Sequence, residues 1–212
     1  MQTMTEIALE KAEQGLFTHP EAAIWVAGTP DRLHSLIKRA LGAGEIVRLR
    51  RGFYCLADRY LKQKPNPFVL AQRIYGPSYI SMESALSCHG WIPEATYGVT
   101  STSMERSCEF ETPLGRFGFV RVPQVTFYEE VSRAEDEAGN SFFLSTPLKA
   151  LADYVYTHAC DWSTSRPLRE SLRIEESSLA TITSSALERL AGNYASDRVR
   201  RFLEGLGKEA AP

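Results

Sequence analysis

The chain has 212 residues, enough for one large domain or two small ones. Its formal net charge at pH 7 is −2, which argues against a protein that coats nucleic acid regardless of sequence. No apolar run reaches the roughly 18 residues that span a membrane, and the first residues lack the basic and then apolar layout of a secretory signal. The composition therefore predicts a cytoplasmic protein that does not associate with membranes.

Two short helices are expected near the beginning of the chain. The first is predicted over residues 5–14, with Gly15 as its stop, and the second over residues 21–26. Thr18 or His19 is expected to cap the second helix, because the Thr-His-Pro sequence there favours a turn into a helix. We therefore interpret His19 as a cap or turn residue rather than a chemical group.

A third helix is predicted from Pro30 to the glycines at positions 42 and 44, with Thr29 as its N-cap. Apolar residues recur at helical spacing along one side, namely Leu33, Leu36, Ile37, Ala40 and Leu41. The outward side is basic and polar, with Arg32, His34, Ser35, Lys38 and Arg39, and Asp31 is the only acid among them. The pattern predicts a helix with one face in a core and a cationic face in solvent.

A basic hairpin is expected next. Residues 46–50 and 53–56 are short β-prone runs, and Arg51-Gly52 joins them as a turn. Alternation along the first strand places apolar residues on one face and Arg48 and Arg50 on the other. The pattern is typical of the small two-stranded wing that follows the reading helix in some DNA-binding domains.

Positive charge is concentrated in this part of the chain. Between residues 32 and 54 there are six Lys or Arg and one acid, a local formal charge of +5. A solvated basic surface on a small helical domain would also give such a run. The order helix, helix, basic helix and hairpin favours a winged helix-turn-helix domain over residues 1–60 that binds double-stranded DNA. The predicted DNA-binding residues are Arg32, His34, Ser35, Lys38, Arg39, Arg48, Arg50 and Arg51.

A second domain is predicted over residues 66–212, after a polar segment with two prolines at residues 57–67. Helices are predicted over residues 68–75, 82–88 after Ser81, 147–158 after Thr146, 167–173, 184–191 and 196–206. Strands are predicted over residues 96–102, 108–112, 116–122, 125–130 and 141–144, with an acidic loop at 133–139. The whole chain is thus predicted to be α+β, with a mixed α/β second domain built on an antiparallel sheet and C-terminal helices.

Aromatic residues in one of these strands could suggest a platform for stacked bases. Phe117 and Phe119 share a strand face, but an antiparallel sheet needs one apolar face toward its core. We therefore predict that both are core residues.

Enzyme chemistry finds little support in the sequence. Glu109 and Glu111 share a strand face, yet no lysine has an acid two positions before it, as a common nuclease site would require. Ser87 has no orienting acid at a recognisable spacing, and the phosphate-binding glycine motifs are absent. We predict a protein that is not an enzyme and that binds no cofactor.

Four cysteines are scattered along the chain without CxxC spacing, at Cys55, Cys88, Cys108 and Cys160. They are predicted to be reduced thiols rather than disulfides. Cys88-His89 and His158-x-Cys160 could be imagined as zinc ligands, but adjacent residues on a helix diverge by about 100°. No metal site is therefore expected.

Three stretches of the chain resemble a known family. They are GEIVRLRRGFYCLA at residues 44–57, PSYISMESALSCHGWIPE with TYGVTSTSMERSCEFETPLGRFGFVRV at 77–122, and STPLKALADYVY at 145–156. Together they cover most of residues 29–158, and in them the chain resembles the AbiEi-family antitoxins, the regulator half of bacterial type IV toxin–antitoxin pairs. The resemblance implies a winged-helix repressor that binds operator repeats in its own promoter. It also implies a C-terminal domain that counters a nucleotidyltransferase toxin.

Two other functions remain open at this level. The first is a stand-alone winged-helix transcriptional regulator whose second domain is a sensor or a protein-interaction module. The second is an enzyme acting on nucleic acid, which the weak constellations above disfavour. A toxin gene next to this one would favour the antitoxin.

Overall fold

The protein is α+β in a computed structural model that describes residues 2–93 and 97–210. Residues 94–96, which include the predicted start of the strand at 96–102, lie outside the described part. Contacts between Cα atoms divide the chain into two compact units: Met1–Leu70 with Phe110–Arg116, and Ala71–Glu109 with Phe117–Pro212. Within the described ranges, no helix combines the length and apolarity needed to cross a bilayer.

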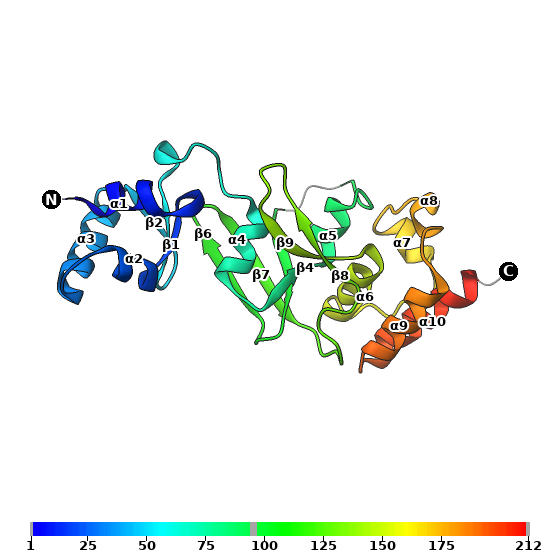
Figure 1. Ribbon diagram of the computed structural model, residues 1–212. Helices are drawn as coiled ribbons and strands as arrows, with labels where there is room; N and C mark the ends of the chain where they lie inside the picture. Colours follow the sequence, from blue (N-terminus) through cyan, green and yellow to red (C-terminus); the bar gives the residue numbers. More distant parts are fainter. Residues whose placement is uncertain (1, 94–96, 211–212) are drawn as a thin grey trace. The chain divides into compact units, whose positions relative to one another are not determined.

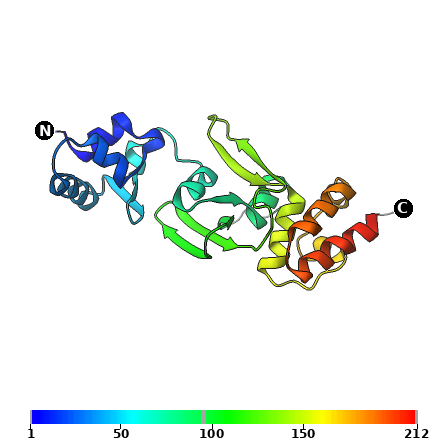
Figure 2. The same ribbon diagram turned by 60° about the horizontal axis from the view of Figure 1, so that its bottom comes forward.

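The first unit consists of short helices and a small sheet (Figures 1 and 2). In chain order its elements are α1 Met4–Lys11, η1 Glu13–Gly15, β1 Leu16–Thr18, α2 His19–Trp25, α3 Pro30–Gly42, β2 Ile46–Arg50, β3 Phe53–Leu56 and η2 Asp58–Tyr60. The sheet has the order β1-β3-β2, and both pairings are antiparallel. The prediction of α3 and of the hairpin β2–β3 is confirmed, whereas β1 was not predicted.

Threonine caps define where the helices begin. Thr3 and Thr18 each form a capping box, in which the hydroxyl accepts from the N3 backbone and the N3 glutamate, Glu6 or Glu21, bonds back to the cap. Of the two candidates for capping α2, Thr18 is therefore the cap. The prediction that the first helix runs to residue 14 is wrong, because α1 ends at Lys11 and Ala12 has the extended backbone angles φ −85° and ψ 115°.

The core of the first unit gathers the apolar side of α3 and residues of the other elements. Leu33, Leu36, Ile37 and Ala40 are all buried, as the helical spacing predicts. They pack in one cluster that includes Phe17 and Tyr54, whose rings stack 5.5 Å apart. Burial of this face fixes the opposite, basic face of α3 toward solvent.

A six-stranded sheet in the order β6-β7-β5-β4-β9-β8 supplies the strands of the second unit, except that Phe110–Arg116 of the β6–β7 hairpin belongs to the first unit. Its strands are β4 Ser78–Ile80, β5 Gly98–Ser103, β6 Cys108–Thr112, β7 Gly115–Arg121, β8 Val131–Glu135 and β9 Ser141–Ser145. Its helices are α4 Pro67–Ile74, α5 Met82–Cys88, α6 Pro147–Thr157, α7 Arg166–Glu170, α8 Glu176–Leu179, α9 Ser184–Asn193 and α10 Asp197–Ala210. The units divide within α4 and within the β6–β7 hairpin.

Two predictions about this sheet are wrong. The sheet is mixed rather than antiparallel, because the unpredicted strand β4 pairs in parallel with β9 at Ile80 and Leu144. No strand covers residues 125–130. The backbone of Val125 and Thr126 bonds Asn193 instead, and Glu130 has φ +56°. The strand lies further on, at β8, which overlaps the first three residues of the segment 133–139 that was predicted to be an acidic loop.

Other parts of the second unit follow the sequence closely. The hairpin β6–β7 forms, and Phe117 and Phe119 are both buried as predicted. Ser81 and Thr146 occupy the N-cap positions of α5 and α6. Helices α9 and α10 pack against each other and against α6. In the C-terminal part, α8 is an additional short helix that was not predicted.

Candidate nucleic-acid interface

The basic face of α3 is prepared by the local sequence. The Thr29 hydroxyl accepts from the Arg32 backbone N–H at 3.4 Å, and Pro30 occupies the first turn, so the helix begins at a defined residue. The residues predicted to bind DNA on this helix are all exposed, namely Arg32, His34, Ser35, Lys38 and Arg39. Because the apolar face is buried, these five side chains share the solvent side of the helix.

Arg32 also holds the turn before α3. Its Nη1 donates to the Ala27 carbonyl at 2.6 Å, across Gly28. Gly28 has φ +128°, and a Cβ there would lie 3.1 Å from Arg32 Cδ, so the turn needs glycine. Part of the Arg32 guanidinium is therefore engaged within the protein.

The other residues of this face differ in how free they are. Arg39 Nε donates to the Ser35 carbonyl one turn earlier, at 3.3 Å, and its two Nη groups have no hydrogen-bond partner within the described ranges. Within residues 2–93 and 97–210, the side chains of Lys38 and His34 have no hydrogen bond or ion pair. Lys38 and His34 are thus the most available groups on this face.

The basic hairpin (residues 46–56) presents three more arginines. Arg48, Arg50 and Arg51 are exposed, whereas Leu49 is buried, in keeping with the predicted alternation. The register between β2 and β3 shifts between Arg48 and Arg50, which is a β-bulge. Bulges increase local twist and redirect side chains, so the bulge sets the directions of the two arginines that flank it.

The turn of the hairpin is tied to another element. Gly52 has φ +74°, a conformation that glycine adopts without strain. Its carbonyl accepts from the His19 backbone N–H at 2.8 Å, so the turn is fixed to the start of α2. Arg51 therefore stands at a positioned turn rather than at a loose loop.

One acid, Asp31 in the first turn of α3, is exposed beside these cations, and it forms no salt bridge in the described ranges. Glu45, the one acid between residues 32 and 54, accepts a 2.6 Å hydrogen bond from the Thr5 hydroxyl on α1. In the described ranges, neither the arginines of the hairpin nor Lys38 form a salt bridge. The first unit therefore exposes uncompensated positive charge on α3 and on the hairpin, which suits a polyanion.

The second unit contains a buried polar cluster that sequence analysis missed. Lys149 and Asp153 on α6 are fully buried. The Asp153 carboxylate accepts hydrogen bonds from four hydroxyl groups, those of Tyr79 (2.9 Å), Ser81 (2.7 Å), Thr102 (3.0 Å) and Tyr194 (2.6 Å). These donors come from distant parts of the chain, so Asp153 joins the sheet, α6 and the segment after α9.

Lys149 is held differently. Its ammonium donates to Gln124 Oε1 and lies 4.8 Å from the Tyr194 ring centroid and 5.4 Å from that of Tyr79. Burial lowers the pKa of Lys149, and the negative charge of Asp153 opposes this shift. Burial, reinforced by Asp153, raises the pKa of Tyr79 and Tyr194 well above the ordinary tyrosine value. Because Lys149 and Asp153 have no exposed surface, we assign the cluster a structural role.

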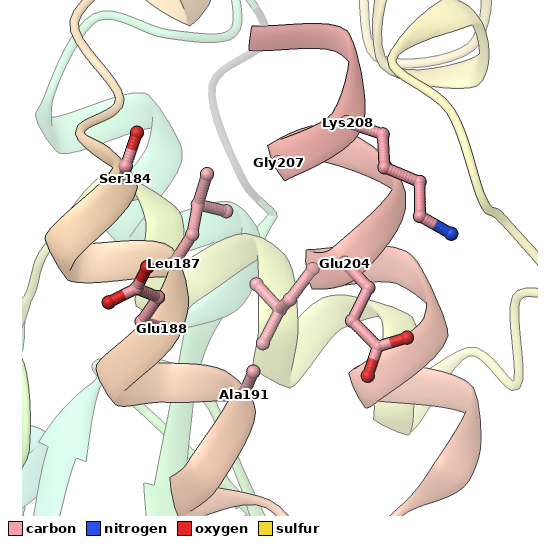
Figure 3. A pocket seen from close by; sticks show the side chains of 8 residues that line it. Ser184, Leu187, Glu188, Ala191, Glu204, Gly207 and Lys208 are labelled. Atoms are coloured by element: carbon pink, nitrogen blue, oxygen red, sulfur yellow. The ribbon is translucent and has the colours of Figure 1, made fainter. Parts of the chain in front are cut away.

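A surface groove of about 440 Å³ lies between α9 and α10 (Figure 3). Its apolar floor contains Leu187 and Leu203, both buried. The charged groups at its rim, Glu188, Glu204 and Lys208, point in different directions rather than toward a common point. The groove therefore lacks the convergent polar groups of a catalytic site.

The two histidines that were considered as zinc ligands have other partners. The His89 ring nitrogen Nε2 lies 2.9 Å from the Ser145 carbonyl, and His158 Nε2 lies 2.8 Å from Glu83 Oε1. In the part of the chain that the structure describes, no three His, Cys, Asp or Glu residues are grouped so as to hold a metal ion. All four cysteines are free thiols, as predicted.

Two comparisons with known proteins gave no match. Neither a scan against protein-family models nor a search of curated proteins found a protein or family that resembles this chain closely enough to be assigned. The resemblance to AbiEi-family antitoxins therefore stays a prediction from the residues quoted above.

Proposed function

We propose that this protein is a sequence-specific, double-stranded DNA-binding transcriptional repressor. The observation that carries the proposal is the uncompensated positive charge on the outward face of α3 and on the basic hairpin. Lys and Arg that neutralise phosphates release counterions, which is the main source of affinity for DNA. The protein as a whole has a net charge of −2, so this attraction is local.

The order of elements supports a winged helix-turn-helix as the DNA-binding unit. Helices α2 and α3 follow each other through a tight turn, and β1, β2 and β3 form a small sheet in which the hairpin β2–β3 follows α3 directly. In such domains the second helix of the pair enters the major groove and the wing contacts the flanking backbone. Here those roles fall to α3 and to the basic hairpin.

The proposed roles of individual residues follow from their exposure and from the hydrogen bonds that their side chains already make. Lys38, Arg39, Ser35 and His34 face outward on α3 and would meet base edges, where Arg and Lys best read guanine. Arg48, Arg50 and Arg51 would contact phosphates or an adjacent minor groove and set the register of binding. Arg32, bonded to the Ala27 carbonyl, would contribute at the backbone beside the turn.

The proposal has a second half, which rests on the family resemblance alone. The protein would act as the antitoxin of a type IV pair: it would repress its own operon through promoter repeats and counter a nucleotidyltransferase toxin. It would do so without catalysis and without a cofactor. In this view the second unit carries the antitoxin activity.

A mobility-shift titration of the full chain tests the DNA-binding half. We expect tighter binding to a duplex from the region upstream of its own gene than to a random duplex of equal length, with affinity falling steeply as salt rises. Equal affinity for both duplexes would contradict sequence-specific repression.

Co-expression tests the antitoxin half. If a nucleotidyltransferase gene lies beside this one, its product should arrest growth, and this protein should relieve the arrest. Persistent arrest at full expression of this protein would reject the antitoxin role and leave the stand-alone regulator.

A further inference from the structure

One edge of the six-stranded sheet is formed by β8, whose neighbour in the sheet is β9. The two strands form a hairpin that extends beyond the sheet in Figure 2. Ser132, Arg133 and Glu135 of β8 are exposed. An edge strand presents backbone N–H and C=O groups that can pair with another strand.

The register of the hairpin shows which residues face the open edge. Thr146 N donates to Glu130 O and Asp136 N donates to Asn140 O, both at 2.9 Å. In an antiparallel ladder, every second residue directs its backbone N–H and C=O groups toward the partner strand. In β8 the residues that do so are Ser132 and Ala134, whose backbone groups bond β9. The backbone groups of Arg133 and Glu135 therefore point outward, and within the described ranges no other backbone group bonds them.

The charges on this edge are of opposite sign. Arg133 and Glu135 lie on the same face of β8, two residues apart. Arg133 Nη2 donates to the Ser141 hydroxyl at 2.6 Å, and the Glu135 carboxylate has no hydrogen bond in the described part of the chain. Charges commonly protect edge strands by repelling other strands. A positive and a negative charge on one edge instead attract an added strand that places a negative charge opposite Arg133 and a positive charge opposite Glu135.

A second copy of β8, added antiparallel, carries that reverse order. Alternation allows only registers in which Arg133 and Glu135 meet odd-numbered residues. A two-fold axis at Arg133 would oppose two arginines, and one at Glu135 would oppose two glutamates, which is unfavourable. An axis at Ala134 places Arg133 of each copy opposite Glu135 of the other. This is the register in which both charges are matched within the strand.

We propose that β8 is a self-association site at which a second copy of this chain adds its own β8 antiparallel, across a two-fold axis at Ala134. Each Arg133–Glu135 pair exchanges its backbone hydrogen bonds and also places opposite charges side by side. The interface is isologous, as in most homodimers. This interface uses none of the residues proposed to bind DNA, so self-association can be measured in the absence of DNA.

Charge reversal in the full chain tests the pairing. Sedimentation equilibrium over a range of protein concentrations should show a dimer for the wild type, weakened about tenfold or more by Arg133→Glu or by Glu135→Arg. The double variant Arg133→Glu with Glu135→Arg restores matched charges and should dimerise as the wild type does. Arg166→Glu, the same charge change on an exposed residue of α7, is the control and should leave the dimer unchanged.

Two results would overturn the proposal. One is a wild type that stays monomeric across the series. The other is a double variant as weak as its two parents, since any non-specific effect of charge would not be repaired by the swap. Circular dichroism of each variant verifies that it is folded.

A cysteine on the two-fold axis gives a second, independent test. Ala134 would face its own copy as a non-hydrogen-bonded pair, with Cα atoms about 4.5 Å apart, within the range that a disulfide bridges. Ala134→Cys should therefore yield a disulfide-linked dimer on oxidation. Ser132→Cys, on the same face but off the axis, should cross-link no more than the wild type with its four native thiols. Equal cross-linking of the two variants would reject the register.

Discussion

At the scale of single residues, Arg39 is the clearest proposed reader of bases. Its Nε donates a hydrogen bond to the Ser35 carbonyl, and its two Nη groups have no partner in the described part of the chain. We expect Arg39→Ala to lose about 1 to 3 kcal/mol of discrimination at one base position, measured by competition between single-base variants of the operator. Arg39→Lys keeps the charge but not the bidentate fork, so it should lose discrimination while keeping most of the non-specific affinity.

An equal loss by Arg39→Ala on specific and random duplexes would contradict this role. Arg39 would then belong with the phosphate contacts, and the base-reading role would fall to Lys38 and its neighbours. The salt dependence of binding distinguishes a base contact from a phosphate contact, because only a lost phosphate contact lowers the slope of log K against log salt.

The buried pair on α6 makes a second prediction at this scale. Asp153→Asn replaces an acceptor of four hydroxyl groups by a side chain with one acceptor atom, so we expect a loss of about 3 to 5 kcal/mol in the free energy of unfolding. Lys149→Met keeps the side-chain volume but leaves the buried Asp153 carboxylate without its nearby cation and Gln124 Oε1 without this donor. Because burial already disfavours the charged lysine, the loss for Lys149→Met should be smaller than that for Asp153→Asn. Urea denaturation of both variants makes the comparison. A loss for Lys149→Met as large as that for Asp153→Asn would show that Lys149 stabilises the fold.

The burial of these two residues was beyond the reach of sequence analysis. Polar residues on an amphipathic helix are assigned to its solvent side, whereas the buried apolar residues of α6, Leu148, Leu151, Ala152 and Val155, recur at helical spacing. What buries Lys149 and Asp153 is a second layer, formed by Gln124 and Tyr194 from distant parts of the chain. Local periodicity carries no information about such a layer.

At the scale of elements, the basic hairpin is proposed to clamp the DNA backbone. The double variant Arg50→Ala with Arg51→Ala should weaken binding to all duplexes and lower the slope of log K against log salt by about 0.9 for each lost phosphate contact. Arg166→Ala with Arg169→Ala on α7 removes the same charge from exposed positions and serves as the control. Mobility shifts over a salt series measure both. An unchanged slope for the hairpin variant would remove it from the phosphate contacts.

Elements with local signals were predicted well. Helices α3 and α6 each begin with Thr-Pro, and the hairpins β2–β3 and β6–β7 have turns that contain glycine at positive φ. Strands β1 and β4 have three residues each, too few for an alternation to be recognised. Residues 125–130 have the composition of a strand but bond Asn193 instead, so tertiary contacts override their propensity.

At the scale of the whole molecule, the buried cluster couples stability to pH. The pKa of Lys149 in the folded state lies below its ordinary value of 10.5, so the unfolded state binds more protons between these two values. The contribution of Lys149 to stability should therefore rise with pH in that window and be lost as pH falls through the folded pKa. The stability of the wild type relative to Lys149→Met should accordingly rise as pH approaches 10.5.

Urea unfolding of both proteins between pH 6 and pH 10, within the range below ordinary tyrosine ionisation, measures this difference. Tyr79 and Tyr194 have raised pKa values, and their contribution is lost only as pH rises above about 10. A difference between the two proteins that stays constant with pH would show that Lys149 does not titrate in this window.

The sequence by itself determined the α+β class, the capped amphipathic helix α3, the basic hairpin and the exposure of the eight predicted DNA-binding residues. These features depend on the spacing of neighbouring residues, which periodicity and turn chemistry record directly. Only the tertiary structure decided that the sheet is mixed, that β8 is its edge and that α6 buries a lysine and an aspartate. These depend on pairing and packing between segments far apart in the chain, and no local pattern specifies those partners.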